Sequence, residues 1–143
     1  MKHLVTTILS LLLAIIAHGQ TSAIVVWEDR VDSWGSTEFQ SVIKTIDGGF
    51  IAAGNNGQDG LIVKYDTSNT VEWTNIYWTM NNDYHWIHSI VQHSDGGYVF
   101  VGTVIFDADE DLWLVKINNL GEVVWDYRRL EENDQEGIDL VET

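Results

Sequence analysis

Short runs of apolar residues alternate along this chain with turns rich in glycine, asparagine and aspartate, a pattern typical of an all-β protein. One pair of runs flanks Asp47-Gly48, and an Asp-Gly pair between apolar runs indicates a β-hairpin with a type I′ turn. Helices are disfavoured because β-branched and aromatic residues dominate the runs. The pattern predicts a four-stranded antiparallel unit over residues 39–78. Its strands are expected at 41–45, 50–54 and 61–65, with a fourth that ends on Trp73.

The same pattern occurs a second time about 50 residues further along, which is the sign of a repeat architecture. Residues 41–54 correspond to 89–102. Residues 59–73 correspond to 111–125, and a second four-stranded unit is therefore predicted over 86–130. Residues shared by both copies are interpreted as structural, since a repeated feature serves each unit in turn. They are Asp47, Gly48, Gly49, Gly54, Asp59, Lys64 and Trp73 in the first copy, and Asp95, Gly96, Gly97, Gly102, Asp111, Lys116 and Trp125 in the second.

Partial copies of the unit flank the two full ones. Residues 23–30 resemble the fourth strand of a unit, and residues 137–143 resemble the first. Four-stranded units at this spacing are typical of the blades of a β-propeller, which closes with about four to eight of them. We therefore expect an incomplete β-propeller, with two full blades and two lone strands, that is a fragment of a longer protein. The alternative fold is a β-sandwich, although sandwich strands have no reason to recur in register.

The repeat also carries a resemblance to a known family. Its motif reads S-[IV]-x4-D-G-G-[FY]-[IV]-x2-G, followed by D-x2-[LI]-V-K and a closing tryptophan. This motif resembles the repeat of exported bacterial β-propeller proteins of the Bacteroidota type, and the resemblance extends from Phe39 to Thr143. It implies an exported propeller but no particular activity, because a propeller is a scaffold that hosts many functions.

The N-terminus differs from the rest of the chain. Lys2 and His3 precede an apolar run, and Ala17 and Gly19 supply the small residues of a cleavage site. The run is shorter than the roughly 20 residues that a spanning helix requires. Residues 1–19 are therefore predicted to be a signal peptide, and the mature protein is expected to be secreted or held at the cell surface.

Composition narrows the classes of partner. The chain has 22 acidic residues against 7 Lys and Arg, and its formal net charge is −15. Such a charge repels phosphates and anionic lipids, so nucleic acids and membrane surfaces are not expected partners. No cysteine is present, and packing rather than disulfides must hold the fold together. The expected partners are a protein or a glycan, and missing blades or further copies of the chain that cover the apolar outer blade faces.

One end of the predicted blades is the candidate ligand face. It carries the connections between the second and third strands and between successive blades, which are expected to be longer than the tight turns at the other end. Aromatic side chains beside carboxylates at this end suit a sugar ring or a cation. The ligand-face residues are Trp78, Tyr84, Trp86, Phe106 and Glu110.

A weak calcium candidate lies in one of these connections. Asp107, Asp109 and Asp111 place carboxylates at alternate positions, as in the first half of an EF-hand loop. Leu112 then stands where that loop needs glycine. This mismatch favours a solvated acidic loop over a metal site, and no other cofactor is expected.

Lys64 and Lys116 recur in otherwise apolar strands, together with Asp59 and Asp111. A buried charge needs a partner, so each lysine is expected to form an ion pair with one of these aspartates. Structural pairs recur once per blade, whereas an active site is usually made once. Repetition therefore disfavours a catalytic role.

Further candidate chemistry is sparse. His85, in the connection before the second unit, lies near His88 and His93, but the last two differ in strand parity and do not converge as zinc ligands must. No nucleophile motif, phosphate loop or cofactor fingerprint occurs. The sequence favours a noncatalytic scaffold or binding module for a protein or glycan. The alternative is a fragment of a propeller enzyme that acts on extracellular polysaccharide.

Overall fold

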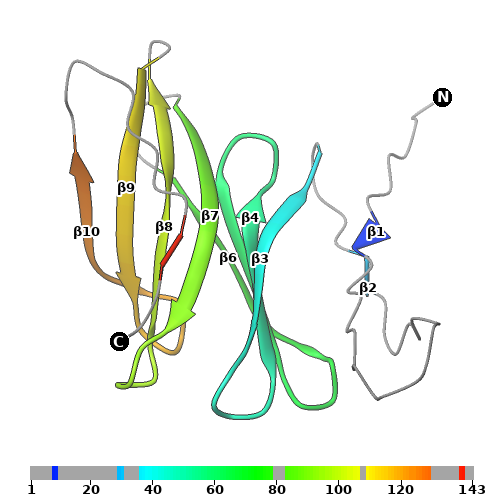
Figure 1. The fold of residues 1–143 in the computed structure, drawn as a ribbon. Coiled ribbons are helices and arrows are strands. Elements are labelled where there is room, and N and C mark those ends of the chain that lie inside the picture. The colour runs from blue at the N-terminus through cyan, green and yellow to red at the C-terminus, as the bar shows by residue number, and fades with distance from the viewer. Residues whose placement is uncertain are drawn as a thin grey trace, which may run out of the picture.

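The computed structural model describes residues 36–78, 83–106, 109–129 and 139–140, together with the strand residues 8–9 and 29–30. This part of the chain is all-β, and its main feature is a pair of four-stranded antiparallel sheets (Figure 1). Within these ranges no helix is long and apolar enough to cross a membrane.

Each predicted unit forms one sheet with its strands in chain order. The first sheet contains β3 (Glu38–Lys44), β4 (Phe50–Asn55), β5 (Gly60–Tyr65) and β6 (Val71–Tyr77). The second sheet contains β7 (Tyr84–Gln92), β8 (Tyr98–Phe106), β9 (Asp109–Ile117) and β10 (Val123–Arg129). The prediction of two four-stranded antiparallel units is confirmed.

The two ends of the chain are described only in part. Residues 23–28 and most of the predicted signal peptide lie outside the described residues. β2 (Asp29–Arg30) pairs with β1 (Ile8–Leu9). The lone strand expected over residues 23–30 stays a prediction. Of the predicted strand 137–143, only Asp139 and Leu140 are described, and they are not in a strand.

The four tight hairpins share one loop type, which is not the expected type I′ turn. In the first, the Gly48 amide donates to the Thr45 carbonyl, and the Thr45 amide donates to the Gly49 carbonyl. Gly48 has a φ of +90°, and no positive φ occurs at Asp47. This is a three-residue loop in which a type I turn is followed by a left-handed residue. The equivalent position is occupied by Gly96, Asn69 and Gly121 in the other hairpins, all with positive φ.

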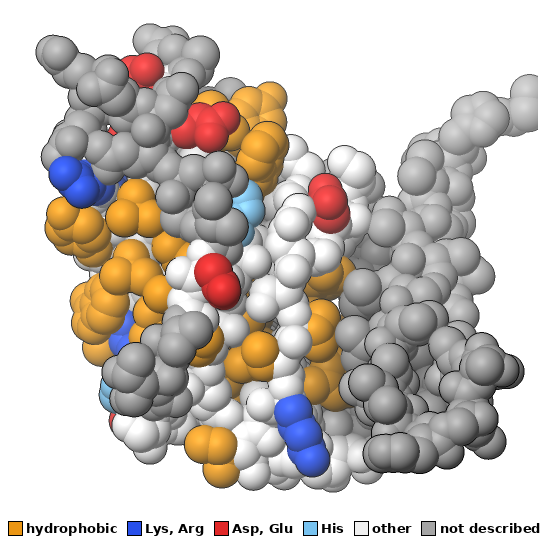
Figure 2. Space-filling model, viewed as in Figure 1, with side chains coloured by type: hydrophobic (Ala, Val, Ile, Leu, Met, Phe, Trp, Pro, Cys, Tyr) orange, Lys and Arg blue, Asp and Glu red, His pale blue; other side chains and the backbone are white. Residues whose placement is uncertain are grey.

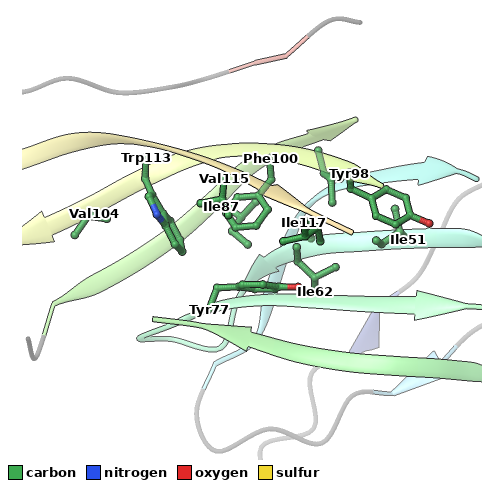
Figure 3. Packing of buried hydrophobic residues seen from close by; sticks show 12 residues of the cluster. Ile51, Ile62, Tyr77, Ile87, Tyr98, Phe100, Val104, Trp113, Val115 and Ile117 are labelled. Carbon is green, nitrogen blue, oxygen red and sulfur yellow. The ribbon is translucent and has the colours of Figure 1, made fainter. Parts of the chain in front are cut away.

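The two sheets pack face to face over one hydrophobic core (Figure 3). Tyr77 of the first sheet meets Phe100 edge-on with ring centroids 5.2 Å apart, and Phe100 meets Trp113 edge-on at 5.1 Å. The remaining buried members are Ile51, Ala53, Ile62, Ile87, Ile90, Tyr98, Val104, Val115 and Ile117. Aromatic pairs at these angles add to the energy of burial, so this core ties one sheet to the other.

The two copies use different faces in this interface. The second sheet contributes Tyr98, Phe100 and Val115. The corresponding residues of the first sheet lie on its opposite face, where Val63 belongs to a separate cluster made of Leu61, Val63 and Tyr65 with Phe39 and Phe50. The packing is therefore head-to-tail, because each copy faces the same way along the stack. A pair of face-packed sheets is common to stacked propeller blades and to β-sandwiches.

Candidate functional site

The antiparallel strand order gives the pair of sheets two distinct ends. The turn end carries the four tight hairpins, at residues 45–49, 66–70, 93–97 and 118–122. The loop end carries the connections 56–59, 78–83 and 107–108. The prediction of long connections between second and third strands is wrong for the second copy, because β8 ends at Phe106 and β9 already begins at Asp109.

At the turn end, each repeated lysine is paired with the aspartate of the Asp-Gly-Gly hairpin. Lys64 Nζ lies 2.9 Å from Asp47 Oδ2 and 2.7 Å from Glu72 Oε2, and Lys116 Nζ lies 2.8 Å from Asp95 Oδ1. The expected partners Asp59 and Asp111 are not the ones found. Both ammonium groups are largely buried, so these carboxylates neutralise charges that would otherwise be costly.

These contacts hold the hairpin carboxylates in their charged form. The Thr45 hydroxyl, the Lys64 ammonium and the Gly49 amide lower the pKa of Asp47 to about 2, although partial burial opposes them. In the second copy, Lys116 and then the Gly97 amide lower the pKa of Asp95. Each aspartate thus links a turn, through its backbone amides, to a lysine of the third strand.

Acid is therefore expected to destabilise the protein between about pH 4 and pH 2. A carboxylate whose pKa is lower in the folded state than in the unfolded state, here 3.8, stabilises the fold at pH values above the unfolded-state pKa. That contribution is lost as the pH falls through the folded-state pKa. Asp47 is 55% exposed, so screening limits its share to about 1 kcal/mol. Thermal unfolding is followed by circular dichroism at pH 6 and at pH 2. The fall in melting temperature between the two pH values should be smaller for Asp47→Asn than for wild type.

Asp109→Asn is the matched control for this measurement, because Asp109 is exposed at the opposite end of its sheet. It should retain the full loss of thermal stability between the two pH values. An equal loss in Asp47→Asn and wild type would contradict the role given to the hairpin aspartate.

A groove of about 670 Å³ opens between the sheets at the turn end. No site is predicted at this position from the sequence. Its lining mixes exposed apolar side chains with half-exposed carboxylates, and the buried Lys64 in this lining is already paired with two of those carboxylates. The lining residues are Ile46, Asp47, Lys64, Glu72, Trp73, Gln92, Ser94, Asp95, Gly96, Tyr98, Asn119 and Leu120.

His85 lies at the loop end, fully buried on β7 rather than in a connection. Its backbone amide donates to the Gln58 carbonyl at 2.7 Å, and its Nδ1 lies 3.7 Å from Asp59 Oδ1. Its ring meets Trp113 edge-on with centroids 5.3 Å apart. Burial lowers the pKa of His85, and the nearby carboxylates of Asp59 and Asp83 only partly oppose it. A neutral His85 therefore joins the second sheet to a loop of the first.

The structure brings three of the five ligand-face residues together. Tyr84 pairs with Ile105, which pairs in turn with Glu110, so these three side chains share a face of the second sheet. Trp86, two residues along β7 from Tyr84, lies on the same face. Tyr84 and Trp86 are 50% and 37% exposed. We call Tyr84, Trp86 and Glu110 the aromatic site.

Trp78, another of the ligand-face residues, does not join the aromatic site. Trp78 is 63% exposed and lines a separate cavity of about 370 Å³ between β6 and β10, together with Trp113 and Arg128. The Phe106 side chain lies outside the described residues. Trp78 is exposed because it lies just after the end of β6. Its separation from Tyr84 in space depends on how the sheets pack, which the sequence does not reveal.

The calcium prediction stays untested in part. Asp107 lies outside the described residues, and Asp109 and Asp111 belong to β9 rather than to a loop. Asp111 is buried and Asp109 is exposed. Within the described ranges, no group of three or more His, Cys, Asp or Glu residues is placed to hold a metal ion.

The repeat, its two sheets and its exposed aromatic site define an all-β protein built from tandem four-stranded antiparallel sheets. Comparison with known proteins finds neither a matching family model nor a matching curated protein.

Proposed function

We propose that this chain is an exported, noncatalytic segment of a β-propeller, which serves as a scaffold that binds a glycan at the aromatic site. In this proposal the two sheets are successive blades of a longer protein, and the leader directs that protein to the cell exterior. Head-to-tail packing supports the blade interpretation over a sandwich, because it lets the same interface recur from blade to blade.

The observation that carries the binding role is the difference between the two copies at equivalent positions. Tyr84, Trp86 and Glu110 correspond to Ser36, Glu38 and Gln58 in the first sheet. All three positions of the first copy are exposed, even though the second sheet covers much of that face. Residues that maintain the blade recur in both copies, whereas the aromatic pair occurs only in the second. An added pair of exposed aromatic rings has no role in stabilising the repeat.

The chemistry of the aromatic site suits a neutral sugar. Tyrosine and tryptophan present flat apolar rings with a polar edge, which match the apolar face and hydroxyl rim of a pyranose. Glu110 supplies a carboxylate that accepts hydrogen bonds from sugar hydroxyl groups. The net charge of −15 argues against polyanionic glycans as ligands.

Binding of neutral oligosaccharides to the purified chain on a glycan array is the first test. For an oligosaccharide that binds, Trp86→Ala and Tyr84→Ala are each expected to weaken the affinity at least about tenfold by calorimetry, equivalent to about 1.4 kcal/mol. The reason is the loss of ring surface that stacks on the sugar.

Two controls locate the effect. Ile46→Ala removes an even more exposed apolar side chain at the turn end, and Trp78→Ala removes an exposed tryptophan outside the aromatic site. Both should bind like wild type. Failure to bind any glycan, or equal binding by Trp86→Ala, would refute the proposed site. Release of reducing sugar from a polysaccharide would instead identify the chain as part of an enzyme.

A further inference from the structure

A cavity of about 370 Å³ lies between β6 and β10, apart from the aromatic site. One wall is the face of the second sheet that packs on the first, where Trp113 pairs with Arg128 and Val115 pairs with Asp126. The other wall is formed by residues 76–78 at the end of β6. Figure 2 shows hydrophobic side chains gathered along β10 and a Lys or Arg side chain at the end of that strand. A volume in this range suits a small organic ligand.

The indole N–H of Trp113 is unpaired, which is uncommon for a buried group. Trp113 is 3% exposed, and its Nε1 has no hydrogen-bond partner among the residues that the structure describes. A buried tryptophan ordinarily finds a partner for this donor, because burying it unpaired costs free energy. The N–H therefore marks a place where a hydrogen-bond acceptor is expected.

The other parts of the Trp113 ring are in contact with protein. Cζ3 lies 3.4 Å from the position of a Cβ atom added at Gly60, and the ring meets His85 and Phe100 edge-on, at centroid distances of 5.3 and 5.1 Å. None of these three residues lines the cavity. Nε1 is diagonally across the indole from Cζ3, so the edge that carries the unpaired N–H is the one left to face the cavity.

Arg128 adds further donors beside this N–H. As the cross-strand partner of Trp113, it projects from the same face of the sheet, close to the indole. Its only ion pair within the described ranges is a long one, with Nη2 3.6 Å from Asp126 Oδ2, and its side chain is 33% exposed. A guanidinium carries five N–H groups in a fixed fork. At 3.6 Å no hydrogen bond forms, so these groups remain available to a ligand.

The repeat shows that neither donor is needed to build the sheet. Leu61 and Ile76 occupy the equivalent positions of the first copy and form the same cross-strand pair. The first sheet thus makes the same strands from an apolar pair, without an indole N–H or a guanidinium. Trp113 and Arg128 are specific to the second copy, as are the residues of the aromatic site. Residues that do not recur are open to a role in binding.

The chemistry of the walls defines the ligand. Two neighbouring donor groups, one of them cationic, suit a carboxylate, which accepts paired hydrogen bonds from a guanidinium. Trp78 and Val123 line the cavity and are 63% and 54% exposed, so they offer apolar surface to the rest of the ligand. A single guanidinium in a chain with a net charge of −15 matches one negative charge and not several.

We infer that this cavity binds a small monocarboxylate with a flat apolar body, such as an arylacetic acid. The carboxylate accepts hydrogen bonds from the Arg128 guanidinium and the Trp113 indole N–H, and the apolar body packs against Trp78 and Val123. Asp126 competes with the ligand for Arg128, and its side chain is 50% exposed, so it can turn to solvent when the ligand binds. The site is independent of the proposed glycan site and of the blade interpretation.

NMR of the purified, isotope-labelled chain during titration with phenylacetate tests the inference at the donor itself. The chain has seven tryptophans, and the loss of one indole N–H signal in Trp113→Phe identifies that of Trp113. This signal should move downfield as phenylacetate binds, because a hydrogen bond to a carboxylate deshields the proton. Phenylacetamide and phenethylamine carry the same ring without the negative charge. Each should bind at least about tenfold more weakly than phenylacetate.

Variants on β10 show which charge holds the ligand. Arg128→Gln should weaken the affinity for phenylacetate at least about tenfold. Arg129 pairs with Leu112 and so lies on the opposite face of the strand. Arg129→Gln removes the same charge and should leave the affinity within about twofold of wild type, because salt screens a charge outside the cavity. Asp126→Asn should strengthen binding, because it removes the carboxylate that competes for Arg128.

Two tryptophan variants separate this cavity from the aromatic site. Trp78→Ala should weaken phenylacetate binding and leave glycan binding intact, whereas Trp86→Ala should do the reverse. Circular dichroism verifies that each variant folds. A Trp113 signal that stays in place throughout the titration would overturn the inference, as would equal affinities for phenylacetate and phenylacetamide. So would equal weakening by Arg128→Gln and Arg129→Gln, since the anion would then be attracted by surface charge alone.

Discussion

Phe100→Ala is expected to lower the free energy of unfolding by about 3–5 kcal/mol, the usual cost of removing a buried aromatic ring. Phe100 is fully buried and lies edge-on to Tyr77 of the first sheet and to Trp113 of its own sheet. Its loss would leave a cavity at the centre of the interface, bounded by rigid strands that cannot collapse to fill it. Urea unfolding followed by circular dichroism measures the change.

Tyr127→Ala is the matched control, because it also truncates an aromatic ring to alanine, but at a position that is 54% exposed. Its effect should stay within about 0.5 kcal/mol, as for most surface substitutions. If the two variants unfolded at the same urea concentration, the interface between the sheets would contribute little to the stability of the fold. Each sheet would then owe its stability mainly to interactions other than the core that it shares with its neighbour.

The strands and their grouping follow from the sequence because they depend on local pattern. Apolar runs at fixed intervals predict strands, and the repeat tests each assignment against a second copy. The hairpin between the third and fourth strands is a further example: Asn69 in one copy corresponds to Gly121 in the other, these residue types tolerate a left-handed backbone, and both have positive φ. Local features with two independent examples are well determined by sequence.

Features that depend on three-dimensional packing were less accessible. The partner of Lys64 was expected among residues close to it in the repeat pattern, yet the carboxylates are Asp47 and Glu72. Glu72 is replaced by Val124 in the second copy, so repetition could not reveal it. The extent of β8 and β9 was also underestimated, because acidic residues such as Asp109 suggest a loop although they pair at the end of a long hairpin.

The candidate site also combines features set by local sequence with features set by three-dimensional packing. Exposure of Tyr84 and Trp86 was predicted from their position beside a connection, and both are exposed. That they share a face with Glu110 and not with Trp78 depends on strand parity across three strands and on sheet packing. Burial of His85 was not predicted, because a histidine between two aromatic residues beside a connection carries no signal of burial.

Gly102→Ala is expected to destabilise the protein by about 3 kcal/mol or more, for a reason that no side-chain contact explains. A Cβ atom at Gly102 would lie 2.0 Å from the Trp86 carbonyl oxygen, beside the irregularity in the pairing of β7 with β8. Gly54 has the same relation to Glu38 in the first copy, at 1.9 Å. The obstructing atom is backbone, so the strand rather than a side chain would have to move, and Trp86 of the aromatic site would move with it.

The control for this variant is Gly96→Asn, at a hairpin position where no atom lies within 4 Å of an added Cβ and where asparagine tolerates the positive φ. It should unfold within about 0.5 kcal/mol of wild type in urea. Glycan affinity provides a second readout, because displacement of Trp86 should weaken binding in Gly102→Ala but not in Gly96→Asn. Equal stability of the two variants would mean that the paired strands can separate at the bulge without cost. The close approach of two backbones would then not explain why both copies have glycine at this position.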